Sequence, residues 1–126
     1  MRGIEWIIDA RGCDAAALRD VDRLRLLFDR LIDLLDLTPV APAAWHVFPP
    51  PGGITGVVML AESHLACHTF PEFGSICLNV FCCRPRPDWD AAPLLADLVG
   101  ASETAVRRLE REYGEVSILA SRRRPA

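Results

Sequence analysis

Residues 61–74 concentrate side chains that can take part in catalysis. The segment reads Ala-Glu-Ser-His-Leu-Ala-Cys-His-Thr-Phe-Pro-Glu-Phe-Gly and contains two of the three histidines of the chain, His64 and His68. Ser63 supplies a hydroxyl that can act as a nucleophile, and Glu62 precedes it directly. The segment should lie in a sheet, where polar groups are costly to bury unless they are hydrogen-bonded or used. It is therefore the first candidate for a functional site.

Each of these residues also has an ordinary structural interpretation. Ser63 fits a strand serine, His68 a hydrogen-bonded core histidine, and Glu72 a carboxylate in a turn. A serine hydrolase is disfavoured, because Ser63 lacks the flanking glycines of the sharp turn that exposes such a nucleophile.

A zinc site is another chemical alternative. The ligand types are present in His64, Cys67, His68 and Cys82 or Cys83. On a strand, however, the two histidines face one side and Cys67 faces the other, and the chain has no Cys-x-x-Cys pair. We therefore expect no metal.

Size and charge limit the partners of the chain. Its 126 residues, 51% of them hydrophobic, suit a single domain spanning residues 1–126. The net charge of −3 favours no nucleic acid, and the one dense basic run, Arg122–Arg124, lies at the C-terminal end. No apolar run approaches bilayer-spanning length, and the first residues do not resemble an export signal. We expect neither a nucleic-acid nor a membrane partner.

Cysteine and lysine usage narrows the chemistry further. Five cysteines form no even framework, which favours free thiols in a reducing compartment, so we expect a cytoplasmic protein without disulfides. All fourteen basic residues are arginines, so the chain has no lysine. Pyridoxal enzymes hold their cofactor as a Schiff base on a lysine, and that route to amino-acid chemistry is therefore closed.

Strands and helices must position the candidate segment, and apolar spacing predicts where they lie. The clearest element is a helix after the N-cap candidate Asp14, because apolar residues recur at helical spacing through Asp36. Residues 104–113 fit a helix or a strand equally well. The other expected elements are strands at residues 4–10, 45–48, 55–61, 65–70, 76–83 and 115–120, a turn at 71–74 and a helix at 88–99.

The order β-α-β-β-β-α-β indicates an α+β fold. We expect a two-layer sandwich, in which a mainly antiparallel sheet carries two helices on one face. The strands at residues 65–70 and 76–83 should pair as an antiparallel hairpin, because only a short turn separates them.

The motifs around the candidate segment resemble those of the prokaryotic S-adenosylmethionine decarboxylase family. The resemblance is strongest over residues 45–83, and the Glu-Ser-His unit followed by His-Thr-aromatic-Pro-Glu is its most specific part. The matching motifs are, in order, Gly-Ile-Thr-Gly-Val-Val at residues 53–58, Ala-Glu-Ser-His-Leu at 61–65, His-Thr-Phe-Pro-Glu-Phe-Gly at 68–74 and Phe-Cys-Cys at 81–83.

The resemblance implies a proenzyme that cuts itself between Glu62 and Ser63. The products would be a β chain of residues 1–62 and an α chain of residues 63–126, with Ser63 converted to a pyruvoyl group as the covalent cofactor. The ketone of such a group can condense with a substrate α-amine and accept electrons as carbon dioxide leaves, as pyridoxal would. The implied substrate is S-adenosylmethionine, and its decarboxylated product would serve polyamine (spermidine) synthesis.

By the same resemblance, three further residues would take part in the chemistry. Cys83 would return a proton to the substrate carbon, since a thiol can hold and deliver a proton at neutral pH. His68 would remove a proton when the ester formed during self-cleavage is eliminated, with the hydroxyl of Thr55 in support. Cys82 beside Cys83 leaves the donor ambiguous, although alternation along a strand allows only one of the two to face the site.

The resemblance also implies a substrate pocket. Phe48 and Phe70 would face a sulfonium cation with their rings, and Glu72 would accept hydrogen bonds from a ribose diol. The chain departs from the family at Phe70, where tryptophan is common, at Asn79, where aspartate is common, and at Arg84, where glycine is usual. Arg84 would place a guanidinium beside the proposed proton donor.

Strand geometry divides these residues into two groups. With a turn at residues 71–74, Ser63 should lie roughly opposite Val80, so that Cys83 is close by. His68 is five residues further along, about 16 Å at ~3.3 Å per residue. We therefore expect a two-fold homodimer, a larger sandwich with composite sites, in which one chain supplies Ser63 and Cys83. The partner would supply the rest, namely Thr55, His68, Phe48 and Glu72.

Two other functions remain open. A relative with the same pyruvoyl machinery could decarboxylate ornithine or arginine, with a polar or anionic group for the distal cation in place of adenine contacts. A catalytically inactive paralogue that regulates an active partner is the second, and the retention of Glu62, Ser63, His68 and Cys83 argues against it.

Overall fold

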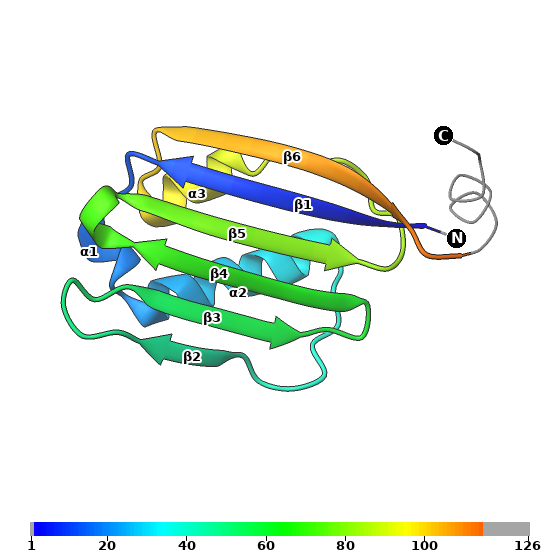
Figure 1. The fold of residues 1–126 in the computed structure, drawn as a ribbon, viewed down its shortest axis with the longest axis horizontal. Helices are drawn as coiled ribbons and strands as arrows, with labels where there is room; N and C mark the ends of the chain where they lie inside the picture. Colours follow the sequence, from blue (N-terminus) through cyan, green and yellow to red (C-terminus); the bar gives the residue numbers. More distant parts are fainter. Residues whose placement is uncertain (1, 115–126) are drawn as a thin grey trace, which may run out of the picture.

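The computed structural model describes residues 2–114 as a six-stranded sheet with helices packed on one face (Figure 1). The strands follow the order β2-β3-β4-β5-β1-β6, and every neighbouring pair is antiparallel. The α+β sandwich expected from the sequence is confirmed. The elements are β1 (Arg2–Arg11), α1 (Ala15–Leu18), α2 (Val21–Leu35), β2 (Ala44–Val47), β3 (Ile54–Met59), β4 (Ser63–Phe70), the 3-10 turn η1 (Pro71–Phe73), β5 (Ser75–Cys82), α3 (Ala92–Val99) and β6 (Glu103–Glu112).

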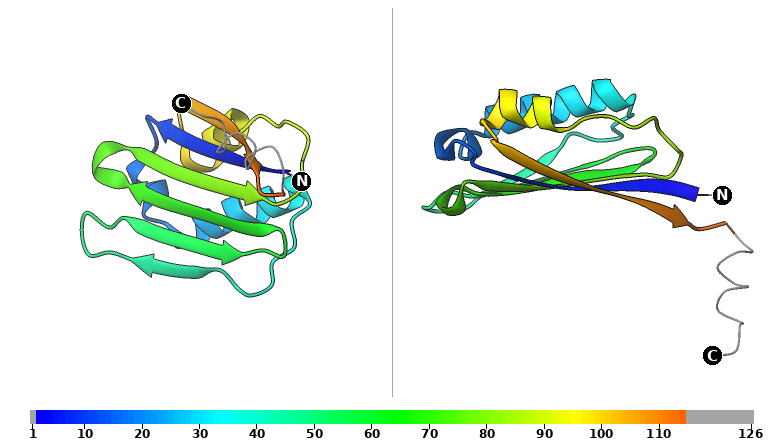
Figure 2. Two further views of the ribbon diagram at one scale, coloured as in Figure 1. Left: turned by 45° about the vertical axis from the view of Figure 1, so that its right-hand side comes forward. Right: turned by 90° about the horizontal axis from the view of Figure 1, so that it is seen from above.

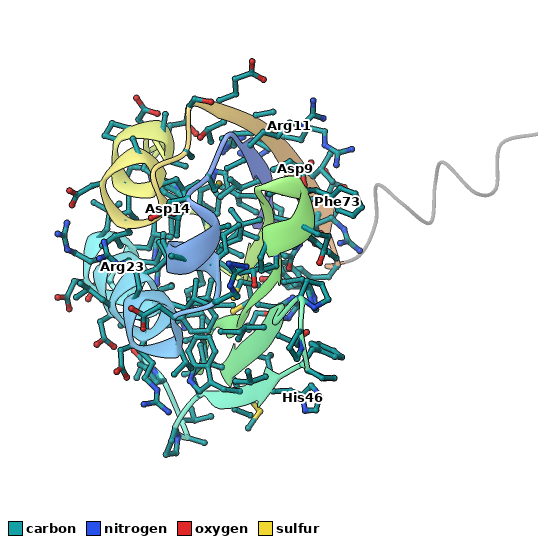
Figure 3. All side chains as sticks on the ribbon, turned by 90° about the vertical axis from the view of Figure 1, so that its left-hand side faces the viewer. Asp9, Arg11, Asp14, Arg23, His46 and Phe73 are labelled. Carbon is teal, nitrogen blue, oxygen red and sulfur yellow. The ribbon has the colours of Figure 1, made fainter. Side chains whose placement is uncertain are left out.

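Alternation along the strands gives the sheet one buried and one open face. Even-numbered residues of β1 and β5, such as Trp6 and Val80, are buried beneath the helices, while their odd-numbered neighbours face away. Figure 2 shows in its right-hand view that all the helices lie on the same side of the sheet. In Figure 3, His46 and Phe73 extend on the opposite side, whereas Arg23 lies among the helices. The open face is therefore free to carry polar or interacting groups.

The single helix expected from Asp14 to Asp36 is wrong in one respect, because the chain breaks it at Arg19. Asp14 caps α1, and Asp20 then caps α2 by accepting hydrogen bonds from two backbone N–H groups at its start. Aspartate is a strong N-cap, so a second cap inside an apolar pattern restarts the helix. α2 is amphipathic, and none of the helices described in residues 2–114 is long and apolar enough to cross a membrane. Its buried residues are Leu24, Leu27, Phe28, Leu31 and Leu35.

Three further expectations changed or fell outside the structure. The helix expected at residues 88–99 begins only at Ala92, whose N–H donates to the side chain of Asp90. The ambiguous segment 104–113 is a strand, because β6 pairs along the whole of β1. The expected strand at residues 115–120 and the basic run Arg122–Arg124 lie outside the described residues.

The register of the β4–β5 hairpin differs by two residues from the expected one. Phe70 pairs with Ser75 across η1, which Gly74 ends with a φ of 61°, and Ser63 consequently pairs with Cys82. The residue opposite Val80 is Leu65, so the expected Ser63–Val80 pairing is wrong. The tight 3-10 turn uses only residues 71–74, and counting back from it gives the observed pairs. A shift of two leaves each side chain on the same face.

Candidate active site

The peptide bond between Glu62 and Ser63 is fixed where the short link from β3 enters β4. The carbonyl oxygen of Ser63 accepts a hydrogen bond from Leu60 N–H at 3.0 Å. The carbonyl oxygen of Glu62 accepts one from Cys83 N–H at 2.8 Å. Because an N–H donor withdraws electrons from the carbonyl it binds, the carbonyl carbon of Glu62 is held and polarised next to the Ser63 hydroxyl.

The side chain of Glu62 is anchored to the C-terminal end of α2. One carboxylate oxygen accepts from Thr38 N–H at 2.9 Å, and the other lies 3.7 Å from Nη2 of Arg86. Arg86 in turn donates to the carbonyl oxygens of Leu35 and Asp36, at 2.9 Å and 3.3 Å. Burial works to raise the pKa of Glu62, but the hydrogen bond from Thr38 and the nearby Arg86 outweigh it and leave the pKa below its usual value. The carboxylate is therefore ionised and immobilised.

Burial distinguishes the two adjacent cysteines. Cys82 is fully buried among the helix-facing residues, and this burial raises the pKa of its thiol to about 11. Cys83 is partly exposed, and its carbonyl oxygen accepts a hydrogen bond from the Tyr113 hydroxyl at 2.6 Å. Arg84 lines a cavity of about 740 Å³ that also contacts Glu62. Of these two residues, only Cys83 is partly exposed to solvent.

A second group of expected site residues gathers at the other end of the sheet. The hydroxyl of Thr55 lies 3.1 Å from Nδ1 of His68, its direct cross-strand partner on β4. Both line a cavity of about 490 Å³ together with Phe48, Phe70 and Glu72. Aromatic rings, a carboxylate and an imidazole in one open cavity can bind a partly planar polar ligand.

The two groups do not meet within one chain. Ser63 is the first residue of β4 and Phe70 the last, so they lie at opposite ends of the strand (Figure 1). The five-residue step from Ser63 to His68 corresponds to about 16 Å of extended strand. The structure therefore places Ser63 with Cys83, and His68 with Thr55.

Sequence reasoning missed a polar network on the open face next to Ser63. His64 Nδ1 lies 3.4 Å from the Ser63 hydroxyl, and its Nε2 lies 2.9 Å from Oδ1 of Asn79. Asn79 donates at 2.7 Å to Glu5, which also binds Arg111. Strand alternation could have placed His64 and Asn79 on one face. The contribution of Glu5 depends on β1 inserting between β5 and β6, which no local pattern reveals.

No group of three or more His, Cys, Asp or Glu side chains within residues 2–114 is arranged to hold a metal ion. All five cysteines are free thiols. The expected cytoplasmic location stays a prediction from the cysteine content.

Comparison with known proteins gives a consistent relationship. A profile described as S-adenosylmethionine decarboxylase matches residues 4–112. An S-adenosylmethionine decarboxylase proenzyme of Carboxydothermus hydrogenoformans is 37% identical over 110 residues, which cover 86% of this chain and 85% of that protein. One of Clostridium tetani is 34% identical over 123 residues, 94% and 95% of the two chains.

A solved structure agrees with these sequence relatives. The crystal structure of the adenosylmethionine decarboxylase from Aquifex aeolicus superposes with a TM-score of 0.73 at 28% identity. The match covers 90% of this chain and 92% of that one, so it extends over nearly the whole fold. With a family profile along most of its length and relatives of nearly equal extent, the chain belongs to the S-adenosylmethionine decarboxylase family.

Proposed function

We propose that this chain is a proenzyme that cuts itself between Glu62 and Ser63 and then decarboxylates S-adenosylmethionine for polyamine synthesis. The observation that carries the proposal is the hydrogen bond from Cys83 N–H to the Glu62 carbonyl oxygen at 2.8 Å. This contact activates the one carbonyl that the neighbouring Ser63 hydroxyl must attack, and it brings the proposed proton donor to the same point.

Self-cleavage needs only groups that the chain supplies, and water. The Ser63 oxygen bonds to the carbonyl carbon of Glu62, and the bond from that carbon to the Ser63 nitrogen breaks, which turns the peptide into an ester. Removal of the Ser63 Cα proton then breaks the Cβ–O bond and frees a carboxylate on Glu62. The remaining end takes up water and releases ammonia. Arg86, 3.7 Å from the Glu62 side chain, is placed to hold this new C-terminus.

A pyruvoyl group fits the surroundings of Ser63. Ser63 is the first residue of β4 and pairs with Cys82 on β5, so its main chain is fixed. The residue is partly exposed, which leaves it accessible. When formed, the group supplies the electron sink for decarboxylation. The thiol of Cys83 is accessible for returning a proton to the substrate carbon, whereas Cys82 lies in the core and is not.

The cavity at the far end of β4 suits the nucleoside part of S-adenosylmethionine. Phe48 and Phe70, 47% and 38% exposed, offer two aromatic faces for a flat base or a sulfonium cation. Glu72 offers a carboxylate to a ribose diol. Ornithine or arginine could place a distal cation against Glu72 or a ring, but they have neither a flat base to stack between the rings nor a ribose diol for Glu72. The cavity therefore favours S-adenosylmethionine over a basic amino acid.

A face-to-face dimer would unite the two groups of residues. The open face exposes apolar side chains at Val57, Met59 and Leu109, between 43% and 60% exposed, which a second sheet packed on this face would cover. A two-fold axis running between two such faces and across the strands reverses the strand direction. It would set Ser63 of one β4 over the His68 end of the other. Each composite site would then hold Ser63 and Cys83 from one protomer and His68 from its partner.

Mixing two inactive variants tests this arrangement. Ser63→Ala should stay full length, and His68→Ala should stall during processing. Coexpressed, they should give dimers with one complete site, seen as cleavage of half of the Ser63-containing chains. Carbon dioxide release from carboxyl-labelled S-adenosylmethionine, ornithine and arginine would identify the substrate. Absence of any cleavage in mixed dimers, or release from ornithine or arginine alone, would contradict the proposal.

A further inference from the structure

A line of hydrogen bonds begins at the proposed nucleophile, Ser63, and runs from its neighbour His64 across the open face of the sheet. Ser63 and His64 are on β4, Asn79 on β5, Glu5 on β1 and Arg111 on β6. The successive contacts measure 3.4, 2.9, 2.7 and 2.5 Å from the Ser63 hydroxyl to the Arg111 guanidinium. The strands that carry these residues are adjacent in the sheet, so the line is direct (Figure 1).

The donors and acceptors of this line fix the tautomer of His64. A carboxylate only accepts hydrogen bonds, so Asn79 must turn its NH₂ group to Glu5 and its oxygen to His64. The Nε2 atom of His64 must then carry the hydrogen. In the neutral ring, Nδ1 keeps its lone pair and points it at the Ser63 hydroxyl, which donates. This is the arrangement that a base for Ser63 requires.

The carboxylate further along this line, Glu5, is charged. The hydrogen bond from Asn79 lowers the pKa of Glu5, and although burial opposes this, Arg111 lowers the pKa further. Glu5 is therefore ionised, with a side chain only 15% exposed. The Phe81 ring packs edge-on against His64, 5.9 Å between centroids, and Arg111 covers that ring at 5.5 Å. These contacts hold the imidazole in one orientation.

The other candidate base is too far away within the chain. His68 bonds to Thr55 and lies about 16 Å along β4 from Ser63. Among the described residues, His64 has the one imidazole that contacts the Ser63 hydroxyl. A purely structural histidine would link β4 to β5 through Asn79 equally well, but it would not need its free lone pair directed at the nucleophile. The 3.4 Å separation can shorten as the reaction begins, as is common for catalytic contacts at rest.

We propose that His64 is the base for the first step of self-cleavage, with Asn79 and Glu5 as positioning residues. This inference rests on the proposed function. Nδ1 of His64 takes the proton of the Ser63 hydroxyl as the oxygen bonds to the Glu62 carbonyl carbon. When the carbon–nitrogen bond breaks, the same proton passes to the departing nitrogen of Ser63. The ester forms without any external reactant, and His68 of the partner subunit acts only afterwards, in the elimination.

The test follows cleavage of the newly made full chain over time by intact mass, for the wild type and His64→Gln. Glutamine can keep a hydrogen bond to Asn79 but cannot take a proton, so we expect cleavage to slow by about 100-fold or more. Hydroxylamine cuts esters and spares amides, so it should not split stalled His64→Gln, whereas it should split stalled His68→Ala. Added imidazole should partly restore cleavage of His64→Gly.

A matched pair of variants separates positioning from general electrostatic effects. Glu5→Gln lets the Asn79 amide turn over, which moves the hydrogen of His64 onto Nδ1, so cleavage should slow by about 10-fold. Asp9→Asn is the control: Asp9 and Arg107 form an ion pair at 3.6 Å on the same two strands and the same face, outside the line. Asp9→Asn should cleave at the wild-type rate.

Three results would overturn the inference, each in a setting where the wild type cleaves normally. They are folded His64→Gln that cleaves at the wild-type rate, stalled His64→Gln that hydroxylamine splits, and a Glu5→Gln rate equal to that of Asp9→Asn. If His64→Gln fails to fold, the comparison of the cleavage rates of Glu5→Gln and Asp9→Asn still tests the inference. A wild-type chain that never cleaves would instead refute the proposed function.

Discussion

Arg86 joins the two future chains beside the cleavage point. Its guanidinium donates to the carbonyl oxygens of Leu35 and Asp36 and lies 3.7 Å from the Glu62 carboxylate. All three partners precede the Glu62–Ser63 bond, whereas Arg86 follows it. Arg86→Met keeps an unbranched apolar stem but leaves two carbonyls without a donor, so we expect lower stability and weaker association of the cleaved chains.

The size of the effect follows from these contacts. A hydrogen bond from a charged donor contributes about 1.5–3 kcal/mol. Of the hydrogen bonds that Arg86 donates, only the 2.9 Å bond to Leu35 is short, and the side chain is 19% exposed. The combined contribution of these bonds to stability should therefore lie near the lower end of this range. We expect a loss of about 2–3 kcal/mol, or a fall in Tm of roughly 6–12 °C for a domain of this size. Thermal unfolding in a Ser63→Ala background, where the chain stays intact, measures it at fixed protein concentration.

Arg25→Met in the same background is the control. Arg25 lies on α2 and pairs with Asp22 at 3.5 Å, but both side chains are more than half exposed, and such pairs contribute little. Its Tm should change by no more than about 2 °C. If the Tm of Arg86→Met also changes by no more than about 2 °C, the stabilising role of Arg86 beside the cleavage point would be refuted.

Three further changes probe the site and its support. Cys83→Ala should still be cleaved yet lose most turnover, whereas Cys83→Pro, which lacks the N–H bound to the Glu62 carbonyl, should be cleaved far more slowly; equal cleavage rates would exclude that N–H as an activator. Thr69→Val should cost about 2 kcal/mol of unfolding free energy in denaturant titration, because it removes the buried hydrogen bonds to Leu18 and Ile54, and an unchanged midpoint would contradict this. Since the pKa of Glu62 is lower in the folded chain than its usual value, its contribution to stability is fully present at neutral pH and is lost as the pH falls through the lowered pKa. Glu62→Gln should therefore remove part of the acid dependence of unfolding, and an identical pH profile would show that Glu62 contributes none.

Local sequence patterns predicted β4 and β5 to within two residues at their ends, with Ser63 left outside the expected strand, and predicted the alternation of their side chains. Alternation predicted that only one of Cys82 and Cys83 could face the site, and Cys82 is the buried one of the two. The two-residue error in the register of Ser63 did not change which face of the sheet each side chain was expected to occupy, because a shift of two residues preserves the face. The distance between Ser63 and His68 could be predicted from the rise per residue of a strand alone.

Features that depend on contacts distant in sequence could not be predicted. The relation of His64 to Glu5 exists because β1 lies between β5 and β6. The contact of Arg86 with Leu35 depends on how the chain after β5 returns past the end of α2. The break at Asp20 was missed for another reason: apolar spacing continues across it, so the cap was hidden within an unbroken helical pattern.

The central claim is that this chain cuts itself between Glu62 and Ser63 to form a pyruvoyl group. The most direct measurement is the intact mass of the purified protein under denaturing conditions, before and after treatment with a carbonyl-reactive reagent. The account predicts two fragments, residues 1–62 and 63–126, of which the second is lighter by one ammonia than an unmodified chain and reacts as a ketone. A single unreactive chain of 126 residues after long incubation would contradict it.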